Sequence, residues 1–252
     1  MSTPSNTYDV VVIGAGLAGA LVARRLAEAS LTVVTLESRD TPGGLANHGA
    51  GLALLGTPHP YVTLQQQLGE GAAREAWTLT RDNLKRLTDT LKKLGQPFEH
   101  VGSFRPTHSS TQARLLQQSV TQLQQDGFKV DLEEATEQGY VVAMRTQDDV
   151  AFDPTALIEA LLDHPNITLE TGTEVQAIKL REASSDGKAP LLSIWARKHY
   201  IWTSKVVIAG GAHAVQLSQT MRDVISPIHI HTCLLYTSDA ADEEDSVDLG
   251  GR

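Results

Sequence analysis

The chain has 252 residues, of which 41% are hydrophobic and 20% charged, and its formal net charge is -9. This length accommodates one large domain or two modest ones, with a sizeable core in either case. The acidic balance argues against a nucleic-acid partner, because binding to phosphates requires a basic surface. One cysteine provides no disulfide framework, which is typical of a reducing cytoplasm.

No segment has the character of a membrane span. The longest apolar stretch, residues 10–23, is too short and contains three glycines. It also lacks the basic leader of a signal peptide. We therefore expect a cytoplasmic protein.

The last twenty residues, 233–252, differ abruptly from the rest of the chain. They resemble a forward translation of a transposon-type DNA sequencing adaptor, with the stretch between Asp242 and Val247 corresponding to a sample index. A natural acidic tail is the alternative. The tail holds six of the 30 acidic residues and one of the 21 basic residues, so the chain without the tail has a net charge of -4. The adaptor interpretation implies that the native reading frame was interrupted near Thr232.

The amino-terminal residues predict a βαβ unit. A β-branched run over residues 9–13 is typical of a strand buried on both faces. Residues 17–29 are rich in Ala, Leu and Arg and predict a helix, and residues 32–36 predict the second strand.

Later segments predict a Gly-rich loop, three more helices and four more strands. The loop covers residues 43–56. The first helix has an apolar stripe of Leu84, Leu87, Leu91 and Leu94 and ends before Gly95 and Pro97. The second covers residues 111–125, with Leu115, Leu116, Val120 and Leu123 inward. The third starts at Asp153-Pro154 and buries Leu157, Ile158, Leu161 and Leu162. The strands cover residues 168–170, 175–180, 191–195 and 205–209, and Ser184–Gly187 is a predicted turn. Trp195 and Trp202 are expected to flank a turn in a small sheet.

The run GAGLAG at residues 14–19 matches the dinucleotide-binding pattern G-x-G-x-x-G. Gly14 permits a tight turn, Gly16 lets the backbone approach a diphosphate, and Gly19 allows close packing of helix and strand. The helix amino terminus offers free N–H groups and a partial positive charge to phosphates. Glu37, about twenty positions on, is expected to bind the adenosine ribose and to repel a 2′-phosphate, which disfavours NADP. A Gly-rich turn without a ligand is the alternative.

The wider sequence distinguishes FAD from NAD. The run YDVVVIGAGLAG at residues 8–19, followed by ESRDTPGG at residues 37–44, resembles the opening of flavoprotein families that include D-amino-acid oxidases and amine oxidases. Later runs resemble the D-amino-acid-oxidase-like superfamily of FAD-dependent oxidoreductases. These runs are GSF at 102–104, FDPTAL at 152–157, GTEVQAI at 172–178 and VVIAGGAH at 206–213.

That resemblance implies a Rossmann-like, glutathione-reductase-like α/β FAD-binding domain at residues 7–75 and 151–232, with a partial α+β substrate domain at 76–150. It implies oxidation of the C–N bond of an amino acid or secondary amine by hydride transfer to flavin N5. A flavin amine oxidase or desaturase is one alternative, although Leu45 stands where those families carry arginine. A module that binds a dinucleotide without catalysis is another.

The flavin contacts implied by the resemblance lie in five segments. Residues 47–52, NHGAGL, resemble the run of dimethylglycine and sarcosine dehydrogenases whose histidine bonds covalently to flavin, although Asn47 stands where those enzymes have tryptophan. His48 is therefore expected near the isoalloxazine, with a covalent bond or an ordinary hydrogen bond as alternatives. The full set is Gly14, Gly16, Leu17, Ala18, Gly19, Glu37, Ser38, Arg39, Gly43, Gly44, Asn47, His48, Gly49, Val175, Ala209, Gly210 and Gly211.

No catalytic residue is assigned, because the arginine and tyrosine that grip the substrate carboxylate in this superfamily belong to the half of its sequence that has no counterpart here. The pair His229 and His231 could place two imidazoles on one strand face, but no further ligands lie nearby, so an edge strand is expected and no metal site. The 252-residue chain, expressed as written, is expected to be inactive and to aggregate through exposed apolar surface.

Overall fold

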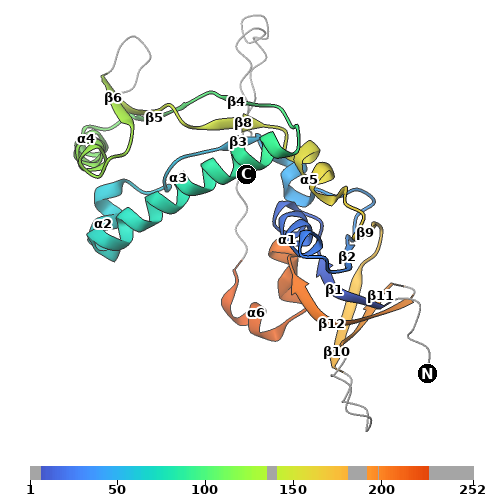
Figure 1. The fold of residues 1–252 in the computed structure, drawn as a ribbon. Helices are drawn as coiled ribbons and strands as arrows, with labels where there is room; N and C mark the ends of the chain where they lie inside the picture. Colours follow the sequence, from blue (N-terminus) through green and yellow to red (C-terminus); the bar gives the residue numbers. More distant parts are fainter. Residues whose placement is uncertain (1–6, 135–140, 181–191, 198, 227–252) are drawn as a thin grey trace, which may run out of the picture.

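The computed structural model describes residues 7–134, 141–180, 192–197 and 199–226 (Figure 1). Its largest sheet has six strands in the order β10 (Val175–Leu180), β11 (Leu192–Ala196), β12 (His199–Ile208), β1 (Thr7–Ile13), β2 (Val33–Leu36) and β9 (Ile167–Glu170). Strands β12, β1, β2 and β9 are parallel, whereas β10, β11 and β12 form an antiparallel meander. This is the predicted Rossmann-like α/β arrangement.

Both faces of strand β1 are buried, which explains its continuous apolar run. Val10 and Val12 pack on one face beneath helices α1 (Leu17–Glu28) and α5 (Pro154–Leu162). Val11 and Ile13 pack on the other face with residues of β2 and the meander. Because the central strand has apolar neighbours on both sides, it provides a rigid base for the turn that follows it.

The chain between residues 52 and 152 forms a second lobe (Figure 1). Its elements are β3 (Leu52–Ala53), α2 (Tyr61–Leu68), α3 (Glu70–Lys93), β4 (Phe98–His100), β5 (Ser103–Thr107), α4 (Ser110–Gln125), β6 (Val130–Glu134), β7 (Val142–Thr146) and β8 (Val150–Phe152). They include two three-stranded sheets with the orders β3-β8-β4 and β5-β7-β6. Trp77 lies in the lobe's apolar cluster, with its ring centroid 5.7 Å from that of Tyr61 and 5.6 Å from that of Phe128.

Helix α3 connects the two parts of the molecule. Its Leu84 packs in the cluster of the second lobe, whereas its Leu91 packs in the cluster beneath α1 and α5. In Figure 1 this helix runs from α2 to the neighbourhood of α5. The expected domain boundary at residue 75 stays a prediction; in the packing, α2 groups with α3 and α4 rather than with the six-stranded sheet.

Buried polar side chains tie the second lobe together. The Tyr61 hydroxyl donates to Asp126 Oδ2 at 2.5 Å, and Arg74 pairs with the other oxygen of that carboxylate. Burial, assisted by Asp126, raises the pKa of Tyr61 to about 12. Burial also acts to raise the pKa of Asp126, but the hydrogen bonds from Tyr61 and Arg74 outweigh it and hold that pKa below its usual value. The fully buried Asp149 accepts from the amide of Leu55 at 2.6 Å and so anchors the loop before α2.

Most of the elements expected from the sequence are confirmed. The βαβ unit, the strand at 175–180 and the helix capped by Asp153 lie where predicted, and the Asp153 carboxylate accepts from the amides of Thr155 and Ala156 at 2.8 and 3.1 Å. Gly95 follows α3 with a φ of 67°. In α4, Leu115 is only half-buried, whereas Ala113 and Ser119 complete the buried face.

Four expectations need correction. Residues 43–56 are not all loop, because they include the short helix η1 (Gly44–His48) and β3. Helix α3 begins at Glu70, well before its leucine stripe, and α2 precedes it. Strand β12 begins at His199 rather than at 205, because the hairpin with β11 extends its pairing. Trp195 and Trp202 lie in the six-stranded sheet on either side of Tyr200, not in a separate small sheet.

Within the described ranges, no helix is both long enough and apolar enough to cross a membrane. The predicted turn at Ser184–Gly187 lies outside the described residues, as do the histidine pair at 229 and 231 and the tail at 233–252.

Candidate dinucleotide-binding site

The candidate site lies where three parallel strands end. In the sheet register, Ile13 of β1 is paired with Leu36 of β2 and with Ile208 of β12. The pairing continues one residue further, because Gly14 N donates to Leu36 O and Ala209 N donates to Ile13 O, each at 2.8 Å. Ligands of open α/β sheets bind at this carboxyl edge of the strands.

The first glycine turn cannot accept side chains at two of its three glycines. Gly14 has a φ of 105°, and a Cβ on it would lie 2.6 Å from the carbonyl oxygen of Ala209. A Cβ on Gly19 would lie 1.9 Å from the carbonyl oxygen of Gly14. These contacts are the tight turn and the close helix–strand packing expected from the sequence.

The remaining glycine of the motif, Gly16, is less crowded than the other two. Gly16 precedes the first residue of α1 and provides no side-chain cap. The amides of Leu17, Ala18 and Gly19 therefore lack acceptors within the helix, as in every first turn. A Cβ on Gly16 would meet only the carbonyl oxygen of Gly43, at 3.8 Å. Free amides at the positive end of a helix are suited to bind the diphosphate of a dinucleotide.

A second glycine turn lies against the first. Gly43 N donates to Ala15 O at 2.9 Å, and residues 16 and 43 form an isolated parallel bridge. Gly43 and Gly44 both have positive φ, 122° and 57°. The two Gly-rich segments, separated by 23 residues of sequence, thus form one continuous backbone surface.

Glu37 connects the first turn to the end of β2. Its side chain is buried, with 6% of the residue exposed. Oε2 accepts from the amide of Ala15 at 2.9 Å, and Oε1 accepts from the amide of Arg39 at 3.0 Å and from the Ser38 hydroxyl at 3.3 Å. Ser38 and Arg39 are themselves exposed. A buried carboxylate held by backbone amides has a fixed orientation.

The segment before β10 wraps around the end of β2. Thr173 N donates to Glu37 O, and Gly172 N donates to Arg39 O, each at 2.7 Å. This places the start of β10 beside the acidic residue. Val175, the first residue of β10, is 9% exposed and packs with Leu36 in the cluster on that face of the sheet.

The remaining predicted residues lie on η1 and after β12. Asn47, His48 and Gly49 are exposed at the end of η1, and Gly49 N donates to Ala46 O at 3.1 Å. Gly210 precedes η2 (Gly211–Gln216), and a Cβ on Gly211 would meet nothing within 4 Å. Ala209 adjoins Gly14, so this segment begins at the first glycine turn.

Sequence reasoning missed contributions that come from backbone or from distant elements. The amide of Ala15 binds Glu37, and the hydroxyl of Thr155 on α5 donates to Asn47 Oδ1 at 3.0 Å. Ala15 carries no side-chain signal for such a role. The sequence predicts that Thr155 lies in the first turn of a helix, but it does not indicate that its hydroxyl contacts Asn47.

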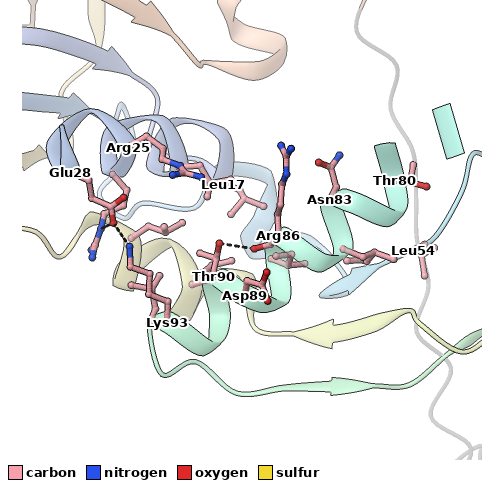
Figure 2. A pocket seen from close by; sticks show the side chains of 18 residues that line it. Leu17, Arg25, Glu28, Leu54, Thr80, Asn83, Arg86, Asp89, Thr90 and Lys93 are labelled. Carbon is pink, nitrogen blue, oxygen red and sulfur yellow. Dashed lines mark hydrogen bonds and ion pairs between the residues drawn. The ribbon is translucent and has the colours of Figure 1, made fainter. Parts of the chain in front are cut away.

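A groove of about 790 Å³ lies between α1, α3 and α5, away from the glycine turns (Figure 2). Of its lining residues only Leu17 belongs to the predicted flavin set. The other lining residues are mostly leucines and charged side chains, among them Lys93, which pairs with Glu28 at 2.8 Å. The glycine turns, unlike this groove, combine a helix amino terminus with free backbone amides, which is the arrangement that binds phosphates in dinucleotide-binding folds. Leu21 and Leu54 of the groove are 38% and 45% exposed.

Comparisons with known proteins place the chain in a family. The model of the family described as DAO, FAD dependent oxidoreductase, matches residues 9–248. A flavin-containing amine oxidase from Oncorhynchus mykiss is 33% identical over 108 residues, which are 41% of this chain and 20% of that protein. The match to the family model extends into residues 233–248, where the adaptor interpretation stays a prediction.

Solved structures share the fold. L-amino acid deaminase from Proteus vulgaris superposes with a TM-score of 0.65 at 19% identity, covering 85% of this chain and 50% of that one. Glycine oxidase from Geobacillus kaustophilus gives 0.63 at 22% identity, covering 84% and 58%. The chain therefore spans little more than half the length of these proteins.

Proposed function

The chain belongs to the DAO family of FAD-dependent oxidoreductases, and we propose that it holds FAD across its two glycine turns and takes part in oxidising the C–N bond of an amino acid or secondary amine. The observation that carries the proposal is the contact between the turns, in which Gly16 and Gly43 are bridged and Glu37 binds the amide of Ala15. One diphosphate can then receive donors from both turns.

Each part of the site has a proposed role. The first-turn amides of α1, at Leu17, Ala18 and Gly19, bind the diphosphate together with the turn at Gly43 and Gly44. An ionised carboxylate can accept about four hydrogen bonds. Glu37 accepts three in the structure, so it retains capacity for a ribose hydroxyl.

The adenosine and flavin ends occupy different segments. On the adenosine side we propose Ser38, Arg39 and the backbone of Val175. On the flavin side we propose Ala209, Gly210, Gly211, Asn47, His48 and Gly49. The carboxylate of Glu37 repels a 2′-phosphate, which is the reason to expect FAD rather than an NADP-type nucleotide.

When bound, FAD would supply the redox chemistry, as the acceptor of a hydride from the carbon that bears the nitrogen. The residues of this chain bind and orient the cofactor through amides and one carboxylate. The second lobe, with its sheet β5-β7-β6, is proposed as part of the substrate domain. Because the chain spans about half of its structural neighbours, no residue in it is proposed as the catalytic base.

A flavin-containing amine oxidase is a second candidate. The 33% identity to the Oncorhynchus mykiss enzyme favours it. Leu45 counts against it, because it is 75% exposed at the position where a basic residue is expected in that class. Primary amines without a carboxylate are the substrates that separate the two candidates.

Anaerobic titration of the flavin-loaded full-length protein tests the proposed function. Successive addition of amino acids and simple amines should bleach the oxidised flavin absorbance with at least one substrate. Bleaching by primary amines alone favours the amine oxidase. A flavin that stays oxidised with every amino acid and amine, yet is reduced by dithionite, contradicts the proposed C–N oxidation and favours a module that binds the nucleotide without catalysis.

We expect the flavin to be bound without a covalent link to His48. His48 is the last residue of η1 and is exposed. Asn47 precedes it, where the flavinylated dehydrogenases that residues 47–52 resemble have tryptophan. Acid precipitation of the holoprotein should therefore release the flavin wholly into the supernatant. Yellow colour remaining in the washed pellet of the native protein, and absent from the pellet of His48→Ala, contradicts this expectation.

A further inference from the structure

Asn47 makes hydrogen bonds to two separate elements. Its Nδ2 donates to the carbonyl oxygen of Pro42 at 3.0 Å, in the segment that leads into the second glycine turn. Its Oδ1 accepts from the hydroxyl of Thr155 at 3.0 Å, in the first turn of α5. One side chain thereby uses both its donor and its acceptor to join the turn to a helix that is more than 100 residues away in sequence.

The same side chain fills the space beside Gly43. A Cβ on Gly43 would lie 1.8 Å from Asn47 Oδ1 and 2.5 Å from Nδ2. Gly43 also has a φ of 122°, which residues with side chains rarely adopt. The absence of a side chain at Gly43 therefore leaves the space that the Asn47 amide occupies against the turn.

The contacts of Asn47 are local and lie near the surface. The residue is exposed, and its two bonds involve the turn and the first turn of α5 rather than a hydrophobic cluster. Helix α5 does not depend on Asn47 for its cap, because Asp153 accepts from the amides of Thr155 and Ala156. Loss of the Asn47 amide should thus loosen the second glycine turn while leaving the hydrophobic clusters intact.

We propose that Asn47 is a positioning residue that holds the second glycine turn against the first, so that amides of both turns face one diphosphate. The inference rests on the proposed binding of FAD across the two turns. Asn47 acts through the backbone at Pro42–Gly44, with Thr155 as its anchor. It sets the affinity for the diphosphate and not the fold of the domain.

The test compares four variants of the full-length protein. Asn47→Ala removes both bonds, Thr155→Val removes only the anchor, Thr155→Ser keeps the hydroxyl, and Asn47→Ala combined with Thr155→Val completes a double-mutant cycle. FAD dissociation constants come from flavin fluorescence quenching of the apoprotein. We expect Asn47→Ala to raise the constant on the order of 10-fold, Thr155→Val to raise it less, Thr155→Ser to leave it unchanged, and the double variant to match Asn47→Ala.

Two further readouts separate positioning from a general structural role. The thermal midpoint of each apoprotein should match that of the native apoprotein. Competition with ADP should weaken in Asn47→Ala, whereas competition with adenosine, which lacks phosphates, should not change. Equal weakening of adenosine, or a lowered apoprotein midpoint that accounts for the lost affinity, overturns the proposal.

The outcomes also separate this inference from the proposed function. A native protein that binds FAD, alongside an Asn47→Ala variant with the same affinity, overturns the role of Asn47 and leaves the proposed function standing. A native protein that does not bind FAD overturns both.

Discussion

Replacing Gly14 with alanine is expected to abolish FAD binding and to destabilise the protein. A Cβ at this position would lie 2.6 Å from the carbonyl oxygen of Ala209 and 3.1 Å from the amide nitrogen of Gly210. Ala209 is itself held beside β1, because its amide donates to Ile13 O at 2.8 Å. The φ of 105° adds backbone strain. Strain and overpacking together should reduce the free energy of unfolding by roughly 3–4 kcal/mol, a large share of typical stability. Urea unfolding of the apoprotein measures that loss, and flavin content measures the binding.

Two glycines of this chain serve as matched controls for Gly14. Gly127 also has a positive φ, 81°, but a Cβ there would meet nothing within 4 Å. Gly127→Ala should therefore show the strain alone, about 1 kcal/mol, with unchanged flavin content. Gly71 lies in α3 with open space around it, so Gly71→Ala should be neutral or slightly stabilising. A Gly14→Ala protein that is as stable and as yellow as Gly71→Ala contradicts the close approach of the first turn to Ala209.

Replacing Glu37 with glutamine is expected to weaken FAD binding by roughly 100-fold. The carboxylate accepts from the amides of Ala15 and Arg39 and from the Ser38 hydroxyl. A glutamine amide group turns an NH₂ toward one of these donors and removes the charge that strengthens the remaining bonds. Hydrogen bonds to charged groups contribute about 1.5–3 kcal/mol, and 2.7 kcal/mol corresponds to a factor of about 100 in the dissociation constant.

Isothermal titration of the apoprotein with FAD measures the effect of Glu37→Gln. The control is Glu159→Gln, an exposed carboxylate on α5 whose replacement should change the affinity by less than about twofold. The same titration with a 2′-phosphorylated adenine nucleotide should show tighter binding to Glu37→Gln than to the native protein, because the repulsion is gone. Unchanged FAD affinity in Glu37→Gln is incompatible with a ribose-binding role for this residue.

Local patterns were sufficient to predict much of the fold. The β-branched run at 9–13 predicts β1 because a strand covered on both faces has no polar side. The Asp153-Pro154 pair predicts the start of α5 because it provides both a cap and a preset first φ, and the structure confirms the cap. The second lobe was harder. Its strands are short, such as the three-residue β4 and β8, and they pair across about 50 residues of sequence, so no local periodicity indicates them.

The candidate site was predictable to the extent that it depends on side chains or glycine spacing. Gly14, Gly19 and Glu37 follow from the dinucleotide motif, and the structure brings them together at one sheet edge. The bridge between Gly16 and Gly43 was not predictable, because it joins backbone atoms of two turns and requires their relative position. The contact between Asn47 and Thr155 likewise depends on how α5 packs, which no sequence spacing encodes.

The flavin content of the purified full-length protein, prepared from cells and then incubated with excess FAD and desalted, tests the central claim most directly. If the two glycine turns and the Glu37 carboxylate bind FAD, the protein should be yellow and carry one FAD per chain. The Gly14→Ala protein should remain colourless after the same treatment. Native protein that folds, stays colourless and does not quench the fluorescence of added FAD contradicts the account.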